Sequence, residues 1–260
     1  MNKGLMNSLA EQVAKISVLA GQTLRENYTG VVEVLSDKEK DIKLAADMDI
    51  EKLIVPALSD LKVAPILSEE GGGSVGSDHI GRRWIVDPLD GSMNFSRGIP
   101  IFSVSISLWN VDVPELGVIH DVVANDTYVG IPGRGAFLNG EPIHVSGIKD
   151  AGRAVLATGF PSGRDYGQES LTEFVGCVRT FKKVRLIGSA ALSLAWVAAG
   201  RMDAYCEEDI SLWDVAAGLA LVAAAGGRFQ MAHTKGFQYQ VFAHNGWLKW
   251  SPLQQADNSA

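Results

Sequence analysis

The chain alternates between stretches with the period of an amphipathic helix and short apolar runs typical of strands, which predicts a mixed α and β protein. Residues 1–25 place Leu5, Leu9 and Val13 at helical spacing among charged residues, so we expect an amphipathic helix there and no signal peptide. We expect this helix to end near Thr29. A second helix is expected over residues 46–58. Strands are expected over residues 64–67, 84–86, 101–109, 115–120 and 127–131.

The pattern changes near residue 146, after which strands alternate with helices. We therefore expect an N-terminal α+β half over residues 1–145 and a C-terminal α/β half over residues 146–260. The segments 190–200 and 215–227 are rich in small apolar residues but too short to span a bilayer, so we expect packed core helices. Residues 254–260 have the composition of a loose polar tail.

The composition favours a protein that acts on small molecules. The 260 residues carry a net charge of -7 without a run of lysine and arginine, which argues against nucleic acid and anionic membranes as partners. The two cysteines, Cys177 and Cys206, form no CxxC motif, as expected in a reducing cytoplasm, and a single disulfide is the alternative.

The strongest chemical signal is the run WIVDPLDGSMNF over residues 84–95. Pro88 biases the residue before it towards an extended backbone, so we expect Asp87 to close a strand and Asp90 to lie in the following turn. Two carboxylates about 4 Å apart repel each other by roughly 4 kcal/mol at an effective dielectric near 20, so a proton or a cation must compensate. Oxygen ligands of this kind suit Mg²⁺, although an ordinary Asx or capping turn is the alternative.

Neighbouring residues favour phosphate chemistry. Gly91 allows the backbone to approach a ligand closely, and Ser92 is expected to begin a helix whose first N–H groups face a phosphate. A second apolar run ends in Glu69 and Glu70, and a third acid, Asp214, is expected in the first turn of a helix.

Three motifs together resemble the inositol monophosphatase family of metal-dependent phosphomonoesterases. They are SEEG at 68–71, the run at 84–95 and LWDVAAG at 212–218, and weaker agreements extend the resemblance over nearly the whole chain. The resemblance implies a layered αβαβα sandwich with the site between the two halves. It also implies lithium sensitivity and a homodimer, while the cysteine usage above favours a cytoplasmic location.

The resemblance implies the following site residues. Two Mg²⁺ ions would be held, with a third, looser ion allowed beside Glu69; their ligands would be Glu69, Asp87, the Leu89 carbonyl, Asp90 and Asp214. Asp87 would bridge the two ions. Ser92, where the family has threonine, would orient and deprotonate the attacking water together with Asp47, and Glu69 would share in catalysis through its ion.

The substrate would be read by a separate set of residues. The N–H groups of Gly91 and Ser92 would bind phosphate, and Glu207 would accept hydrogen bonds from substrate hydroxyls, with a solvated acidic run at 207–209 as the alternative. The remaining substrate-binding residues implied are Gly188, Ser189, Ala190 and Asp214. Met93 occupies a position where nucleotidase and histidinol phosphatase branches often carry lysine, which argues against both. The roles of Arg164, Tyr166 and Arg185 stay open at this point, since 159–166 also has the composition of an exposed loop.

We therefore predict Mg²⁺-dependent hydrolysis of a small polyol or sugar phosphate monoester, with inositol monophosphate the leading substrate. The alternatives are the same chemistry on fructose 1,6-bisphosphate, on a sugar or nucleoside monophosphate or on a nucleotide bisphosphate, and a non-catalytic phosphometabolite-binding protein. The run GGGSVG at 71–76 also matches dinucleotide and serine-elbow patterns, but no helical period follows it, so we reject both.

Overall fold

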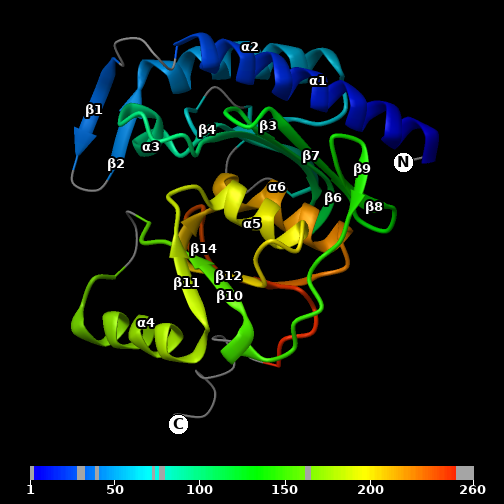
Figure 1. Cartoon of the computed structure of the whole chain (residues 1–260). Coiled ribbons are helices and arrows are strands. Elements are labelled where there is room, and N and C mark those ends of the chain that lie inside the picture. Colours follow the sequence, from blue (N-terminus) through cyan, green and yellow to red (C-terminus); the bar gives the residue numbers. More distant parts are fainter. Residues whose placement is uncertain are drawn as a thin grey trace.

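The computed structural model describes residues 3–27, 33–38, 41–71, 74–75, 80–161 and 165–249. Helices and sheets alternate in five stacked layers, which confirms the expected αβαβα sandwich (Figure 1). Thr29, Arg164 and the tail 254–260 lie outside the described residues. Among the described helices, none combines the length and the apolar character needed to cross a bilayer.

The first sheet has seven strands that follow chain order. They are β3 (Ile66–Ser68), β4 (Arg82–Asp90), β5 (Ser103–Asn110), β6 (Val113–Asp121), β7 (Asp126–Ile131), β8 (Gly135–Leu138) and β9 (Glu141–Ile143). Only β3 and β4 run parallel, and the other neighbours are antiparallel. The end of β4 therefore lies beside the end of β3, which brings two acidic segments to the same edge of the sheet.

Two helices cover the outer face of this sheet (Figure 1). These are α1 (Lys3–Asn27) and α2 (Ala45–Asp60), as the hydrophobic pattern predicts. Leu24, Ile54 and Leu58 from these helices pack in one core cluster with Trp84 and Val86 of β4. Between the two helices in sequence lies a small antiparallel sheet that the hydrophobic pattern did not predict, formed by β1 (Val34–Lys38) and β2 (Asp41–Leu44).

The central layer consists of α5 (Ala190–Ala198) and α6 (Leu212–Ala224), both buried, which confirms the expectation of packed core helices. A glycine lets α6 approach the first sheet closely. A Cβ atom on Gly117 of β6 would lie 2.8 Å from the Cβ of Ala220, well inside normal contact. The absence of a side chain at Gly117 thus sets the distance between sheet and helix.

The second sheet has five strands in the order β11-β10-β12-β14-β13. They are β10 (Val155–Thr158), β11 (Lys183–Leu186), β12 (Ala204–Ser211), β13 (Arg228–Lys235) and β14 (Gln238–His244). The 3₁₀ turn η1 (Ala151–Arg153) precedes β10, and α4 (Gln168–Thr180) covers the outer face of this sheet (Figure 1). The change of sheet falls between residues 143 and 155; a division into folding units at residue 146 stays a prediction.

The structure corrects one expectation at the acidic turn. Asp87 does not close its strand, because β4 continues to Asp90 and pairs there with Ser103 of β5. The pairing register shifts between Asp87 and Asp90, so Pro88, which has no N–H to donate, lies within a bulge. The bulge keeps both acids on a rigid strand. The short helix α3 (Ser92–Ser96) then follows, as expected.

Candidate active site

One cavity of about 320 Å³ opens where β3 and β4 end and where α3, α5 and α6 begin. Eleven of the residues assigned from the sequence line it: Glu69, Asp87, Leu89, Asp90, Gly91, Ser92, Gly188, Ser189, Ala190, Glu207 and Asp214. Asp47 is not in the lining but contacts Ser92. The structure thus brings together residues that are spread over more than half of the chain.

The turn after β4 needs glycine at position 91. Gly91 has a φ of 94°, in the left-handed region, and a Cβ atom there would lie 2.9 Å from the carbonyl oxygen of Ile101. The carboxylate of Asp87 accepts a hydrogen bond from the N–H of Leu89 at 3.0 Å, which fixes the acid against its own strand. The turn is therefore held both by backbone geometry and by one of the acids it carries.

Asp90 is held from both halves of the molecule. It accepts hydrogen bonds from the hydroxyls of Ser103, at 3.0 Å, and Ser189, and from the N–H of Ala190 at 3.0 Å. Ser189 was assigned to substrate binding from the sequence; in the structure it lines the cavity, and its hydroxyl donates to Asp90. In this arrangement Ser189 positions Asp90.

Asn94 was missed by the sequence analysis. Its side-chain nitrogen lies 2.9 Å from the carbonyl oxygen of Ile101 and 2.8 Å from that of Ile187. These bonds tie α3 to the segment that leads into Gly188, which itself has a φ of 73°. No local signal in the sequence marks Asn94, because one partner is distant in sequence and the other lies in irregular backbone.

Four of the acids that line the cavity differ in their contact with solvent. Asp87 and Asp90 are buried, Asp214 is half-buried, and Glu69 is exposed to the open cavity. Loss of bulk water around them raises the pKa of Glu69, Asp87 and Asp214 well above the usual range, and neighbouring carboxylates raise it further. Burial also raises the pKa of Asp90, although its serine donors oppose this.

Such a group of acids holds protons or cations at neutral pH, and its all-oxygen donor set matches the preference of Mg²⁺. Asp87 contacts both Glu69 and Asp214. Within the described part of the chain, no three acidic, histidine or cysteine side chains stand at coordination spacing around one point. Side-chain rotations would therefore have to accompany the binding of an ion. The backbone positions and the chemistry of the donors fit a hard cation.

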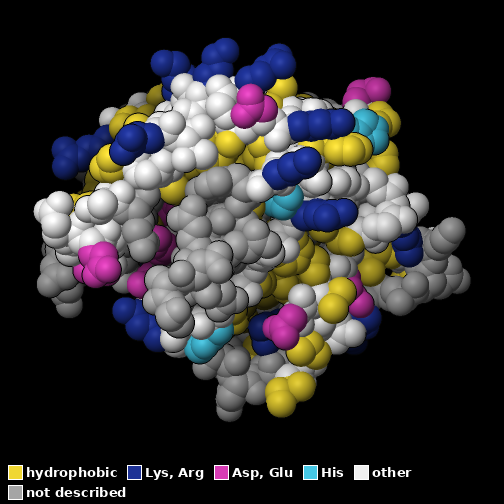
Figure 2. All heavy atoms as spheres, turned by 90° about the horizontal axis from the view of Figure 1, so that it is seen from below, with side chains coloured by type: hydrophobic (Ala, Val, Ile, Leu, Met, Phe, Trp, Pro, Cys, Tyr) yellow, Lys and Arg dark blue, Asp and Glu magenta, His cyan; other side chains and the backbone are white. Residues whose placement is uncertain are grey.

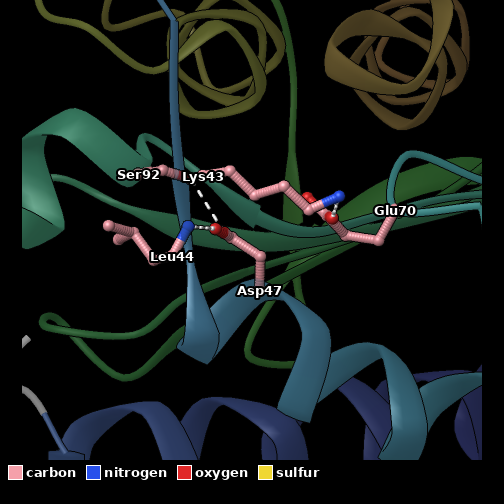
Figure 3. A network of polar contacts seen from close by, with 5 residues as sticks. All are labelled: Lys43, Leu44, Asp47, Glu70 and Ser92. Carbon is pink, nitrogen blue, oxygen red and sulfur yellow. Dashed lines mark hydrogen bonds and ion pairs between the residues drawn. The ribbon is translucent and has the colours of Figure 1, made fainter. Parts of the chain in front are cut away.

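A second polar group lies beside this cluster (Figure 3). Asp47, in the first turn of α2, accepts a hydrogen bond from the N–H of Leu44 at 2.7 Å, and its other oxygen lies 2.9 Å from the hydroxyl of Ser92. Burial raises the pKa of Asp47 to about 6, and the two hydrogen bonds limit the rise. The hydroxyl of Ser92 also lies 2.8 Å from the carbonyl oxygen of Leu89.

The opposite end of the cavity is formed by β12 and the segment after β10. Glu207 is buried, and a Cβ atom at Gly159 would lie 2.9 Å from its carboxyl carbon, so that acid packs directly against the glycine. Asp209, which the sequence analysis did not single out, also lines the cavity and has a left-handed φ of 53°. The alternative of a solvated acidic run is therefore wrong for Glu207.

The residues whose roles the sequence left undecided lie in different positions relative to the cavity. The hydroxyl of Tyr166 donates to the carbonyl oxygen of Phe160 at 2.9 Å, and Phe160 lines the cavity, so Tyr166 supports the wall from outside. Arg185 is exposed on β11 and is not among the lining residues. Met93 is 45 % exposed at the cavity mouth.

The rejected motifs and the disulfide alternative can also be compared with the structure. The hydroxyl of Ser74 accepts a hydrogen bond from the N–H of Ile66 at 3.0 Å, which is a structural role and not that of a nucleophile. Neither Cys177 nor Cys206 forms a disulfide in the part of the chain that the structure describes, so the alternative of a disulfide is wrong.

Comparison with known proteins gives a consistent result. Residues 6–249 match the model of the inositol monophosphatase family. The chain is 39 % identical to an inositol-1-monophosphatase of Mesorhizobium japonicum, covering 85 % of this chain and 84 % of the relative. It is 40 % identical to the Nus factor SuhB of Pseudomonas aeruginosa, covering 75 % of each.

Solved structures agree. The extragenic suppressor protein suhB of Bartonella henselae superposes with a TM-score of 0.82 at 32 % identity, covering 92 % of this chain and 95 % of that one. The inositol monophosphatase of Anabaena superposes with a TM-score of 0.79 at 32 % identity, covering 93 % and 92 %. The chain therefore belongs to the inositol monophosphatase family, which is a family of phosphomonoesterases.

Proposed function

We propose that this chain is a Mg²⁺-dependent phosphatase that hydrolyses a small polyol or sugar phosphate monoester, with inositol monophosphate as the leading candidate. The observation that carries the proposal is the convergence of four carboxylates, a glycine turn and Glu207 on one cavity. The carboxylates supply a place for cations, the turn supplies backbone donors, and Glu207 supplies an acceptor for hydroxyl groups.

The proposed cation ligands divide into two overlapping sets. Glu69, Asp87 and the Leu89 carbonyl would hold one Mg²⁺, and Asp87, Asp90 and Asp214 would hold a second. When bound, Mg²⁺ in such a site lowers the pKa of a water molecule and offsets the charge of the phosphoryl and leaving oxygens. The support from this structure is the crowding of the acids and their raised pKa values, which an ion would relieve.

Ser92 and Asp47 would handle the proton of the attacking water. The Ser92 hydroxyl has one proton and two acceptors in reach, Asp47 and the carbonyl of Leu89. If the carbonyl of Leu89 held an ion, Asp47 would be the acceptor left for the Ser92 hydroxyl, whose lone pairs could then accept from water. That chain of hydrogen bonds orients the water and leads its proton towards a buried carboxylate.

The phosphate and the alcohol would lie at opposite ends of the cavity. The N–H groups of Gly91 and Ser92 would bind phosphate oxygens. Glu207 would accept hydrogen bonds from the alcohol, with Gly188, Ser189 and Ala190 as the facing wall. Asp214 would lie between the two ends. Because the N–H of Ala190 already donates to Asp90, Ala190 contributes a surface and not a donor.

The lining supports a substrate with a single phosphate. Of the lining residues that the structure describes, none is Lys, Arg or His, while Glu207 and Asp209 are acidic. A second phosphate at the alcohol end would therefore be repelled. This favours a monophosphate over fructose 1,6-bisphosphate or a nucleotide bisphosphate, and leaves other sugar and nucleoside monophosphates as alternatives.

A small molecule is also a better partner than nucleic acid. On the face shown in Figure 2, lysine and arginine side chains are separated by apolar, acidic and uncharged ones. Together with the net charge of -7, this gives little support for a nucleic-acid surface. The resemblance further leads us to propose lithium sensitivity and a homodimer, and the cysteine usage a cytoplasmic location, which inhibition assays, sedimentation and fractionation would test.

The decisive experiment measures phosphate release from inositol, fructose, adenosine and histidinol phosphates, each with Mg²⁺ and with a chelator. We expect release only with Mg²⁺, fastest with inositol monophosphate. Asp90→Asn should abolish turnover, whereas Asp112→Asn, an exposed acid in the turn between β5 and β6, should keep it. Turnover by Asp90→Asn near that of the wild type would refute the cation site. Absence of release from every substrate would favour the non-catalytic binding protein.

A further inference from the structure

A lysine lies at the edge of the carboxylate cluster, on the small sheet that the hydrophobic pattern did not predict. The ammonium of Lys43, on β2, forms an ion pair with Glu70 (Figure 3). The Glu70 side chain is only 6 % exposed, while that of Lys43 is 41 % exposed. A nearly buried carboxylate thus has a cation that reaches it from the solvent side.

The ion pair joins two segments that carry proposed catalytic residues. Lys43 directly precedes Leu44, whose N–H donates to Asp47 at 2.7 Å. Glu70 directly follows Glu69, whose N–H donates to the carbonyl oxygen of Val86 of β4 at 3.2 Å. The pair therefore connects the beginning of α2 to the end of β3, with the cavity acids on one side of the connection.

The charge of Lys43 acts on more than its partner. The hydrogen bond to Glu70 raises the pKa of Lys43 most, against burial, which lowers it, and the negative charges of Glu70, Glu69 and Asp47 raise it further. Lys43 therefore stays protonated at neutral pH, and its positive charge interacts with the carboxylates of three acids. One of these, Glu69, is the residue beside which a third, loosely held cation would bind.

The charge of Lys43 affects how many divalent cations the site can bind. Apart from Glu207 and Asp209 at the opposite end of the cavity, six acids lie in or beside the site: Asp47, Glu69, Glu70, Asp87, Asp90 and Asp214. Two Mg²⁺ ions would neutralise four of these charges, and Lys43 neutralises a fifth. Among these six acids, little unbalanced negative charge is then left to attract a further divalent cation, and the ammonium repels one that approaches Glu69.

We propose that Lys43 is a positioning residue that holds β2 on the Glu69–Glu70 segment and takes the place of a third, loosely bound divalent cation beside Glu69. The inference rests on the proposed function, since it presupposes that the cavity binds Mg²⁺. It predicts that this protein binds two Mg²⁺ ions tightly and a third one only weakly. The ammonium of Lys43 is what limits the number.

The test is a titration of the substrate-free, full-length protein with Mg²⁺, by calorimetry at low ionic strength. Lys43→Met keeps the length of the side chain and removes its charge. We expect it to bind Mg²⁺ about tenfold more tightly in the weakest step, or to bind one more ion than the wild type. Lys43→Arg is the matched control, because it keeps the charge, and its titration should agree with that of the wild type.

Glu70→Gln provides a test of opposite sign. It leaves the ammonium without its acid, so Mg²⁺ should bind several-fold more weakly than in the wild type. The same variant serves if Lys43→Met fails to fold, which the near-ultraviolet circular dichroism of each variant would reveal. Raising the NaCl concentration should reduce both differences, because salt screens charges near the surface.

The outcomes separate the two proposals. Titrations of Lys43→Met and the wild type that superimpose, with binding in both, would overturn the role of Lys43 and leave the metal site intact. Weaker binding by Lys43→Met would overturn it as well. Absence of Mg²⁺ binding by the wild type would overturn the proposed function itself.

Discussion

Ser189 contacts Asp90 across the boundary between the two sheets. Its hydroxyl donates to the carboxylate of Asp90 and accepts a hydrogen bond from the N–H of Leu192 at 3.2 Å, so one side chain caps α5 and holds an acid of β4. The beginning of a core helix and the orientation of a proposed cation ligand therefore depend on the same oxygen atom.

Replacing Ser189 with alanine should lower stability and cation affinity together. The lost cap costs about 1 kcal/mol, and the loss of a donor to a buried carboxylate adds about 1–2 kcal/mol. Urea unfolding measures the loss of stability, and a Mg²⁺ titration measures the loss of cation affinity. Ser189→Thr, which keeps the hydroxyl, is the control. A variant that loses stability while Mg²⁺ affinity is unchanged would show that Ser189 does not position Asp90.

The metal-free protein should lose stability as the pH rises. Burial raises the folded-state pKa of the site acids, to about 6 for Asp47, so the folded protein binds more protons than the unfolded chain. This contribution is complete below the ordinary pKa of 3.8 and is lost as the pH rises through the folded pKa. Thermal unfolding in a chelator should thus show a lower Tm at pH 8 than at pH 5.5, and Mg²⁺ should restore it. A Tm in chelator that is equal at the two pH values would contradict this explanation.

Asp87→Asn gives a direct check on that explanation. The variant removes one buried charge, so without metal at pH 8 it should have a higher Tm than the wild type. The addition of Mg²⁺ should raise its Tm by less than that of the wild type. Asp112→Asn, on the surface, should change neither value. A metal-free Tm below that of the wild type would mean that Asp87 is needed for the fold.

The parts of the site that lie close together in sequence could be predicted, and the contacts between distant segments could not. Asp87, Asp90 and Gly91 lie in one short run, and local chemistry is enough to indicate a turn that binds cations. One partner of Asn94, the carbonyl of Ile187, is 93 positions away, and nothing near Asn94 in the sequence indicates it. Lys43 and Glu70 likewise meet only because folding brings β2 to the end of β3.

The bulge at Pro88 shows why a correct local rule can still misplace an element. Proline does favour an extended residue before it, and Asp87 is extended in β4. The strand was expected to end at Asp87, with Asp90 in the following turn, because Pro88 fixes its own φ. Instead the partner strand β5 resumes pairing beyond it, at Ser103, and this depends on tertiary structure.

His120 should make the protein less stable in mild acid. It is buried on β6, and burial, followed by the charge of Arg25, lowers its pKa to about 4. The unfolded chain therefore binds a proton more readily, and the stability that the neutral ring contributes is lost as the pH falls from 6.5 to about 4. The cost over that range is about 3 kcal/mol. His120→Gln should unfold with a shallower dependence on pH there, and an unchanged slope would contradict the assignment.

Gly117 offers a test of the packing that places the central helices. Gly117→Ala would put a methyl group 2.8 Å from the Cβ of Ala220, between a rigid sheet and a buried helix, so neither side can yield cheaply. We expect a loss of about 2–3 kcal/mol in the free energy of unfolding, measured in urea. Gly4→Ala is the control, because a Cβ atom at Gly4 meets nothing within 4 Å and alanine favours a helix. Since α6 carries Asp214 at its beginning, Gly117→Ala should also weaken Mg²⁺ binding, whereas Gly4→Ala should not. Equal stability of the two variants would show that the sheet and α6 can move apart without cost.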